Sequence, residues 1–205
     1  MQPVIFVVED DESFREAIGR LIRSAGLQAK LLGSAQEFLV QDVPDAPCCI
    51  VLDVRLPGLN GLDFQSELAE ANIQVPIVFM TGYGDIPMSV KAMKAGAVEF
   101  LTKPFRDEEL LQAIQVALER DQKRLEGEKA ASSLRTRFDT LTAREQEIMG
   151  FVTTGLLNKH IAAEMGISEK TVKVHRGNVT RKMGVRSVAE LVRMADALGV
   201  RRAKT

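Results

Sequence analysis

The 205-residue sequence is poor in the residues and segments that mark several protein classes. It has no tryptophan, one tyrosine, two cysteines and two histidines. No apolar run approaches the roughly 18 residues that a membrane-spanning helix needs. The start of the chain has no basic segment and meets acidic residues at Glu9, so it does not resemble an export signal. We therefore predict a cytoplasmic protein that does not enter a membrane.

The few cysteines and histidines also argue against disulfide frameworks and structural zinc. Cys48 and Cys49 are adjacent, and neighbouring strand residues point to opposite faces, which disfavours a disulfide between them. Two cysteines with two distant histidines, His160 and His175, do not match a structural zinc site. We expect both cysteines to be small core residues in a reducing compartment.

The charges are present in nearly equal number but are unevenly distributed. Lys plus Arg total 27 and Asp plus Glu total 28, giving a net charge of −1. Residues 1–120 hold 18 acidic and 10 basic side chains, whereas residues 121–205 hold 10 acidic and 17 basic ones. With 45% hydrophobic residues the chain can bury a core, which excludes general disorder. The split predicts two modules, the second of which binds a polyanion.

The first module alternates short β-branched runs with helical patterns. The expected strands are Val4–Val8, Lys30–Leu32, Cys49–Leu52, Pro76–Met80 and Val98–Leu101. The expected helices are Ser13–Ala25, with Ser13 and Glu16 as a capping box, then Ser34–Val40, Leu62–Ala71, Pro87–Ala95 and one from Asp107 onward. Five such units predict an α/β domain with a five-stranded parallel sheet in the flavodoxin-like order 2-1-3-4-5, covered by helices on both faces.

The chain after Phe138 has helical patterns only. Four helices are expected at Thr142–Thr154, Asn158–Met165, Ser168–Met183 and Ser187–Leu198. The second and third of them meet at Gly166 with helix-turn-helix spacing. We predict a domain over 1–120, a charged linker over 121–137 that is helical at its start, and a small all-α domain over 138–205.

Three leucines follow a heptad spacing through the end of the first domain. Leu111, Leu118 and Leu125 lie seven residues apart and would suit the seam of a dimeric coiled coil. A solvated extension of the helix is the alternative, and it is the interpretation we favour.

Acidic residues follow two strands that the expected order makes neighbours. Glu9, Asp10 and Asp11 follow the first strand, and Asp53 follows the third. Ligands bind at the carboxyl ends of parallel strands, and clustered carboxylates without thiol or imidazole suit Mg²⁺. The fourth strand ends in Thr81 and the fifth precedes Lys103, so a hydroxyl and an ammonium are expected at the same edge. Such a set predicts a site for a phosphoryl group, with an Asp as nucleophile.

The segments EDD, LDVRLPGLNG, MTGYGD and FLTKPF, in this order and spacing, resemble the receiver domain of bacterial two-component response regulators. The resemblance covers residues 3 to about 120. It implies that Asp53 accepts a phosphoryl group from the phosphohistidine of a sensor histidine kinase. It also implies that Mg²⁺, or Mn²⁺, is bound by Asp10, Asp53 and the backbone carbonyl of Arg55, with Glu9 acting through water.

The same resemblance assigns three further residues. Thr81 would bond the acyl phosphate, Lys103 would pair with it, and Phe100 would swing inward on activation. Phe100 stands where many relatives have Tyr, and its alternative interpretation is a core residue. Glu9 stands where the family usually has Asp, so we take Asp11 as a flanking acid.

An enzyme of the haloacid-dehalogenase type is the rival interpretation of a strand-end Asp. Such a phosphatase needs a second acid two residues after the nucleophile, and this chain has Arg55 there. We therefore predict no enzyme activity beyond slow self-phosphorylation from small phosphodonors and autodephosphorylation of Asp53.

The third helix of the second domain is strongly basic. Between Glu169 and Met183 it has five basic residues and one acidic residue, a composition typical of DNA binding. The stretch LTAREQEIMGFVTTGLLNKHIAAEMGISEKTVKVHRGNVTRKMGVRS resembles the LuxR-type helix-turn-helix domain over about 138–200. A receiver joined to this domain is similar to the NarL/FixJ group, and TGYGDIPMSVKAMKAGAVEFLTKPF is most similar to its FixJ side.

By this resemblance the protein residues expected to contact DNA fall into two sets, one for the major groove and one for the phosphates. Lys173, Val174 and Gly177 would face the groove, and the phosphate candidates are Asn158, Lys159, Thr171, His175 and Arg176. Gly177 departs from the longer polar residue of many relatives and costs about 1 kcal/mol of helix stability relative to Ala.

The resemblance to both families also implies partners and a switch. We expect phosphorylation to favour a homodimer through a face that includes Val90 and Lys94, and the dimer to bind promoter DNA and contact RNA polymerase. Two alternatives are a receiver with a vestigial DNA-binding domain, against which the basic helix argues, and activation without phosphate, against which the complete acidic site argues.

Overall fold

The computed structural model describes residues 2–82 and 86–200. Five parallel strands form one sheet in the order β2-β1-β3-β4-β5, as the sequence predicts. They are β1 (Val4–Val8), β2 (Gln28–Leu32), β3 (Cys48–Asp53), β4 (Ile77–Thr81) and β5 (Glu99–Thr102). The strand ends differ from the predicted ones by two residues at most. Residues 83–85, which belong to the MTGYGD segment, lie outside the described residues.

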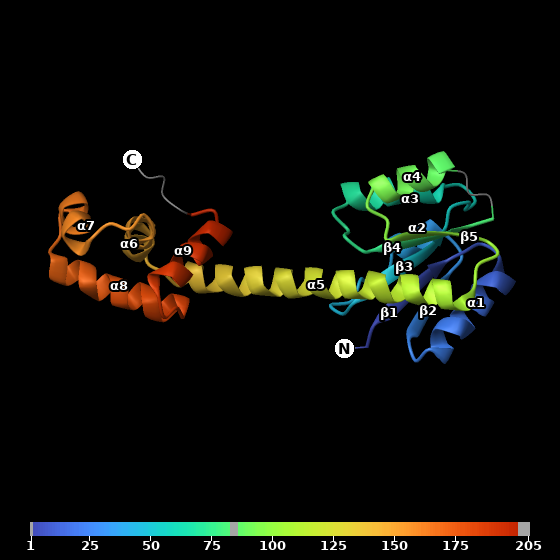
Figure 1. Cartoon of the computed structure of the whole chain (residues 1–205), viewed down its shortest axis with the longest axis horizontal. Coiled ribbons are helices and arrows are strands. Elements are labelled where there is room, and N and C mark those ends of the chain that lie inside the picture. The colour runs from blue at the N-terminus through green and yellow to red at the C-terminus, as the bar shows by residue number, and fades with distance from the viewer. Residues whose placement is uncertain (1, 83–85, 201–205) are drawn as a thin grey trace. The chain divides into compact units, whose positions relative to one another are not determined.

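Helices cover both faces of this sheet (Figure 1). One face packs against α1 (Glu12–Ser24) and α5 (Asp107–Asp139), and the other packs against α2 (Ala35–Leu39), α3 (Gly61–Glu70) and α4 (Ile86–Lys94). Because the sheet is covered on both sides, every residue of β1 and β3 is buried. Cys48 and Cys49 are free thiols in this core, as expected.

The start of α1 differs from the prediction. Asp11, not Ser13, caps the helix, since its Oδ1 accepts a hydrogen bond from Phe14 N at 2.9 Å. Ser13 lies inside the first turn, and Glu16 pairs with Arg23 instead of closing a capping box. Asp and Ser are both favourable N-cap residues, so residue type does not decide between positions 11 and 13.

The helix α5 extends through the whole segment predicted as a linker. Leu118 packs in the core of the sheet domain, and Leu125 is also buried, so neither side chain lies on a free coiled-coil seam. Asp121 is fully buried, accepts a hydrogen bond from Cys48 N at 2.9 Å and pairs with Arg124 at 2.8 Å. The beginning of the predicted linker is therefore fastened to the first residue of β3.

Four helices make up the C-terminal part, as predicted. They are α6 (Ala143–Thr153), α7 (Asn158–Met165), α8 (Glu169–Met183) and α9 (Val188–Ala197). The capping box of Thr142 and Glu145 forms as expected. Gly166 ends α7 with a φ of 64°, a left-handed conformation that favours glycine, and Ser168 then caps α8.

The chain divides into two compact units, residues 1–126 and 127–205, each with its own apolar core. The predicted limits at 120 and 138 stay predictions, and this division falls between them. Among the helices of the described residues, none combines the length and hydrophobicity needed to span a membrane.

Asp121 provides a test of the attachment between α5 and β3. Asp121→Ala leaves the buried Cys48 N without its acceptor, so we expect the first unit to lose about 1–3 kcal/mol of unfolding free energy. Asp121→Asn keeps an acceptor and should lose less. Urea unfolding followed by circular dichroism measures both.

Glu119→Ala, on the exposed face of the same helix, serves as the control and should change stability by about 0.5 kcal/mol or less. Equal stability of wild type and Asp121→Ala would contradict this role.

Candidate functional site

Three charged side chains meet at the carboxyl ends of β1, β3 and β5. The ammonium Nζ of Lys103 lies 2.6 Å from Asp53 Oδ2 and 2.7 Å from Glu9 Oε2. Glu9 and Asp53 are only 2% and 6% exposed. Backbone pairing explains the meeting, because β1 and β3 are hydrogen-bonded neighbours and Lys103 N donates to Thr81 O at the end of β4.

The electrostatics of this trio are dominated by burial of negative charge. Burial, together with the charge of Asp53, raises the pKa of Glu9 to about 7, although the hydrogen bond from Lys103 opposes the rise. Burial alone would lower the pKa of Lys103, but its hydrogen bonds to Asp53 and Glu9 outweigh that effect and raise it. With both acids ionised the trio carries one uncompensated negative charge, which favours binding of a cation.

The remaining residues predicted for this site lie around the trio. Thr81 is fully buried at the end of β4, and Asp10 is exposed just beyond β1. The backbone N of Arg55 donates to Asp53 Oδ1 at 2.8 Å, which fixes the carboxylate from the side of the following loop. Gly61 is required nearby, since a Cβ there would approach the carbonyl oxygen of Asp53 to 2.7 Å.

Two residues of α1 also reach this edge, and neither was predicted to do so from the sequence. Arg15 Nη1 donates to the carbonyl of Glu9 at 2.6 Å and to that of Asp10 at 3.3 Å, so it holds the turn after β1. Phe14 places its ring 4.1 Å from the Lys103 ammonium. In the sequence, the one signal for Phe14 and Arg15 is that they follow the acidic run Glu9–Asp11 within a few residues.

Within residues 2–82 and 86–200, no three His, Cys, Asp or Glu side chains converge closely enough to form a ready-made metal cluster. The groups that are present still fit Mg²⁺ by their chemistry. The candidate ligands are oxygen donors only, and together they carry excess negative charge. Asp10 is exposed, so this edge of the sheet is open to solvent.

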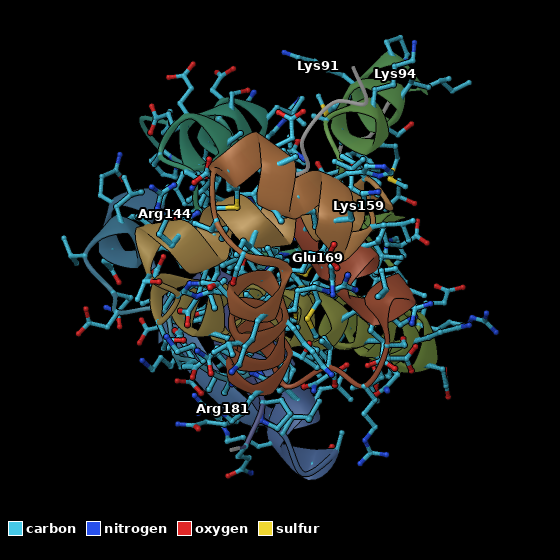
Figure 2. All side chains as sticks on the ribbon, turned by 90° about the vertical axis from the view of Figure 1, so that its left-hand side faces the viewer. Lys91, Lys94, Arg144, Lys159, Glu169 and Arg181 are labelled. Carbon is cyan, nitrogen blue, oxygen red and sulfur yellow. The ribbon has the colours of Figure 1, made fainter. Side chains whose placement is uncertain are left out.

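The predicted switch and dimer residues lie on β5 and α4. Phe100 is half-buried and packs against Phe79, with ring centroids 6.1 Å apart. Val90 and Lys94 are exposed on α4. Lys91 and Lys94 extend away from the α4 ribbon (Figure 2).

The predicted recognition helix, α8, has a buried face and an exposed basic face. Val172, Val179 and Met183 are in the core. Lys170, Lys173, Val174, Gly177 and Arg181 form the exposed face. Figure 2 shows Glu169 and Arg181 toward opposite ends of α8, with Lys159 on α7. Lys173, Val174 and Gly177, the predicted groove residues, thus all lie on the exposed face of α8.

Several basic or polar residues of this region are instead bonded within the domain. Arg176 Nη1 donates to Asn158 Oδ1 at 2.5 Å, so two phosphate candidates bind each other. Thr171 is bonded to the Ser168 cap. Lys182 pairs with Glu145 at 2.6 Å. The five basic residues counted in the sequence therefore divide into three that point outward and two that join α8 to α7 and α6.

Two further α8 residues have distinct surroundings. His175 is half-buried, and its Nδ1 is enclosed without a hydrogen-bond partner among the described residues. A Cβ at Gly177 would meet no atom of the described residues within 4 Å, apart from its chain neighbours and the backbone of its own helix. The packing of the free protein therefore does not require glycine there.

Comparisons with known proteins match both units. Residues 5–115 match the family of response regulator receiver domains, and residues 139–195 match that of the bacterial regulatory proteins of the luxR family. Nodulation protein W of Bradyrhizobium diazoefficiens is 55% identical over 96% of this chain and 87% of its own length. Transcriptional regulatory protein FixJ of Azorhizobium caulinodans is 41% identical over 96% of this chain and 93% of its own.

A solved structure agrees with these matches. The structure of the response regulator StyR is 45% identical, with a TM-score of 0.87 over 96% of this chain and 99% of that one. The fold and both domain matches define a DNA-binding regulator with a receiver domain. The chain belongs to the two-component response regulators that join a receiver to a LuxR-type helix-turn-helix domain, and its similar relatives include FixJ-like proteins.

This membership confirms the predicted fold class and function class. The protein is a transcription regulator rather than an enzyme of the phosphatase type. A receiver implies a histidine kinase as partner, and the luxR-family domain implies DNA binding. Receivers in general use Mg²⁺ at their phosphorylation site.

The Glu145–Lys182 pair predicts a pH dependence of stability. The hydrogen bond from Lys182, with that from Thr142 N, lowers the pKa of Glu145 to about 2. The stabilisation is therefore complete above the ordinary pKa of 4.5 and is lost as the pH falls from there toward 2. Glu145→Gln should cost about 1.5–3 kcal/mol at pH 7.

Thermal unfolding of wild type and Glu145→Gln at several pH values measures this effect. The difference in Tm should be constant above pH 5 and should shrink at lower pH. Glu147→Gln is the control, because Glu147 lies on the exposed side of the same helix and pairs with exposed Arg144. A Tm difference that does not change with pH would rule out the ion pair as its cause.

Proposed function

We propose that Asp53 accepts a phosphoryl group from the phosphohistidine of a sensor histidine kinase, and that this modification controls DNA binding by α8. The observation that carries the proposal is the contact of the buried Asp53 carboxylate with the Lys103 ammonium at 2.6 Å. A carboxylate Oδ attacks phosphorus, the new O–P bond forms as the P–N bond breaks, and the leaving imidazole takes up a proton.

Each neighbouring residue has a role in this transfer. Lys103 pairs with an oxygen of the transferred group, and the Thr81 hydroxyl donates to another. Asp10, Asp53 and the Arg55 carbonyl would hold Mg²⁺ or Mn²⁺, with Glu9 assisting through water. When bound, the cation neutralises charge on the phosphoryl oxygens. The same set supports slow self-phosphorylation from small donors and slow autodephosphorylation, without other enzyme activity.

The output is sequence-specific binding of promoter DNA in the cytoplasm. Lys173, Val174 and Gly177 face the major groove, where Val174, 58% exposed, offers an apolar contact to a thymine methyl group. Lys159 and His175 contact phosphates. Asn158, Thr171 and Arg176 are also proposed phosphate contacts, and their bonds within the domain orient them before DNA arrives.

Phosphorylation acts on DNA binding by favouring a homodimer. Phe100 turns inward, and the face with Val90 and Lys94 then favours a homodimer that binds two half-sites. The bound dimer contacts RNA polymerase. The exposure of Val90, Met93 and Ile86 on α4 supports an apolar interface there.

Asp53→Asn tests the phosphorylation site. Incubation of wild type with acetyl phosphate and Mg²⁺ should add one phosphoryl group, detected by intact-protein mass spectrometry, and Asp53→Asn should remain unmodified. Asp63→Asn, an exposed acid on α3, is the control and should be modified normally. Unchanged labelling of Asp53→Asn would place the phosphoryl group elsewhere.

Asp10→Ala tests the cation site. Loss of a direct ligand should weaken Mg²⁺ binding at least about tenfold, equal to about 1.4 kcal/mol. Isothermal titration calorimetry measures the affinity. Asp11→Ala removes an adjacent exposed acid that caps α1, so it should cost about 0.5–2 kcal/mol of stability while largely keeping the Mg²⁺ affinity. An unchanged affinity in Asp10→Ala would show that Asp10 is not a ligand.

Lys173 and Lys159 test the division of DNA contacts. A base contact is worth roughly 1–3 kcal/mol of discrimination, whereas a phosphate contact lowers affinity for every sequence. Lys173→Ala should therefore flatten the preference for a selected site over random DNA. Lys159→Ala should weaken both and reduce the salt slope by about one unit. Titrations at several salt concentrations that match wild type for both variants would remove both residues from the interface.

A further inference from the structure

The Lys103 ammonium has an aromatic neighbour in addition to its two carboxylates. Its Nζ lies 4.1 Å from the centroid of the Phe14 ring, within the range of a cation–π contact. Phe14 is half-buried, and the Phe105 ring meets it edge-on with centroids 6.2 Å apart and an interplanar angle of 73°. The ammonium is therefore bounded by Asp53, Glu9 and the Phe14 ring.

These three neighbours match the donors of the ammonium. A lysine ammonium has three N–H groups, and the carboxylates of Asp53 and Glu9 each accept one. The third side faces a ring, which attracts a cation without competing as a hydrogen-bond acceptor. Since the Lys103 side chain is only 20% exposed, water screens this attraction less than at an open surface.

The position of the ring is itself fixed by the acidic turn. Asp11 caps α1 by accepting the hydrogen bond from Phe14 N. Arg15, the next residue, holds the carbonyls of Glu9 and Asp10. The turn that carries the acidic residues and the ring that faces Lys103 are therefore parts of one hydrogen-bonded segment.

We infer that Phe14 is a positioning residue that holds the Lys103 ammonium toward Asp53 through its ring face. The inference rests on the proposed phosphorylation of Asp53 and adds a residue that sets how well Lys103 meets the phosphoryl group. A flexible lysine stem loses rotamer freedom when it is held in one place. Because the ring already holds the Lys103 side chain in place, its rotamer entropy is lost before the phosphoryl group arrives. The ammonium then needs no reorganisation during transfer.

Three variants separate the effect of the Phe14 ring from the effect of its apolar volume. Phe14→Leu removes the ring and keeps an apolar side chain, and Phe14→Tyr keeps the ring. Phe105→Leu is the matched control, because it removes a half-buried ring from the same pair but leaves the Phe14 ring over the ammonium. Acetyl phosphate as the donor avoids any contact that a kinase makes with α1.

The first readout is the NMR spectrum of the Lys103 side chain in the full-length protein without phosphodonor. In wild type the ring current should shift the Lys103 Hε signals upfield. The shift should persist in Phe14→Tyr and Phe105→Leu and disappear in Phe14→Leu. Wild-type Lys103 signals in Phe14→Leu would overturn the inference, and this result does not depend on whether Asp53 is phosphorylated.

The second readout is the rate of phosphorylation by acetyl phosphate with Mg²⁺. Phe14→Leu should react about fivefold more slowly, as expected for loss of a partly desolvated cation–π contact. Phe14→Tyr and Phe105→Leu should stay within about twofold of wild type, a change of about 0.4 kcal/mol. Equal slowing by Phe105→Leu, or no slowing in Phe14→Leu, would overturn the inference. Labelling of Asp53→Asn would instead refute the proposed function.

Discussion

The ammonium of Lys103 lies between the carboxylates of Asp53 and Glu9, and the proposed chemistry of the first unit depends on this contact. It joins residues at the carboxyl ends of β1, β3 and β5, which this parallel sheet brings to one edge. The surrounding structure keeps that contact in place. Arg15 holds the turn after β1, the Arg55 N–H fixes the Asp53 carboxylate, and Gly61 allows α3 to approach the strand end. The net negative charge of this buried site favours a bound cation, and the cation would in turn favour a phosphoryl group there.

The second unit uses its positive charge in two ways. Lys182 and Arg176 bond to Glu145 and Asn158, and thereby attach α8 to the helices that present it. Lys170, Lys173 and Arg181 stay exposed and are available to a polyanion. Counting basic residues along a helix would assign all five to DNA. The structure indicates that some of this charge maintains the orientation of the helix, a condition for reading bases at all.

Much of the fold could be predicted because its signals are periodic. The buried runs of β1 and β3 and the apolar stripe of α8 mark strands and a helix without tertiary information. The meeting of Asp53, Glu9 and Lys103 followed from the rule that parallel strands end at one edge. Asp121 was missed because a buried acid in a charge-rich segment looks like any solvated residue until its partner, the distant Cys48 N–H, is known. The α1 cap was misplaced because Asp11 and Ser13 are both good caps. Both failures concern long-range or competing hydrogen bonds, which residue types alone do not rank.

The proposed function requires that phosphorylation of one carboxylate controls DNA binding in the other unit. The most direct measurement is the equilibrium affinity of one preparation of the full chain for a selected DNA site, before and after treatment with acetyl phosphate and Mg²⁺, at fixed salt concentration. Fluorescence anisotropy of labelled DNA reports it, with Asp53→Asn carried in parallel. Wild type should bind at least about tenfold more tightly after treatment, equal to about 1.4 kcal/mol of coupling, and Asp53→Asn should not change. Equal affinity of phosphorylated and unphosphorylated wild type would contradict the proposed function.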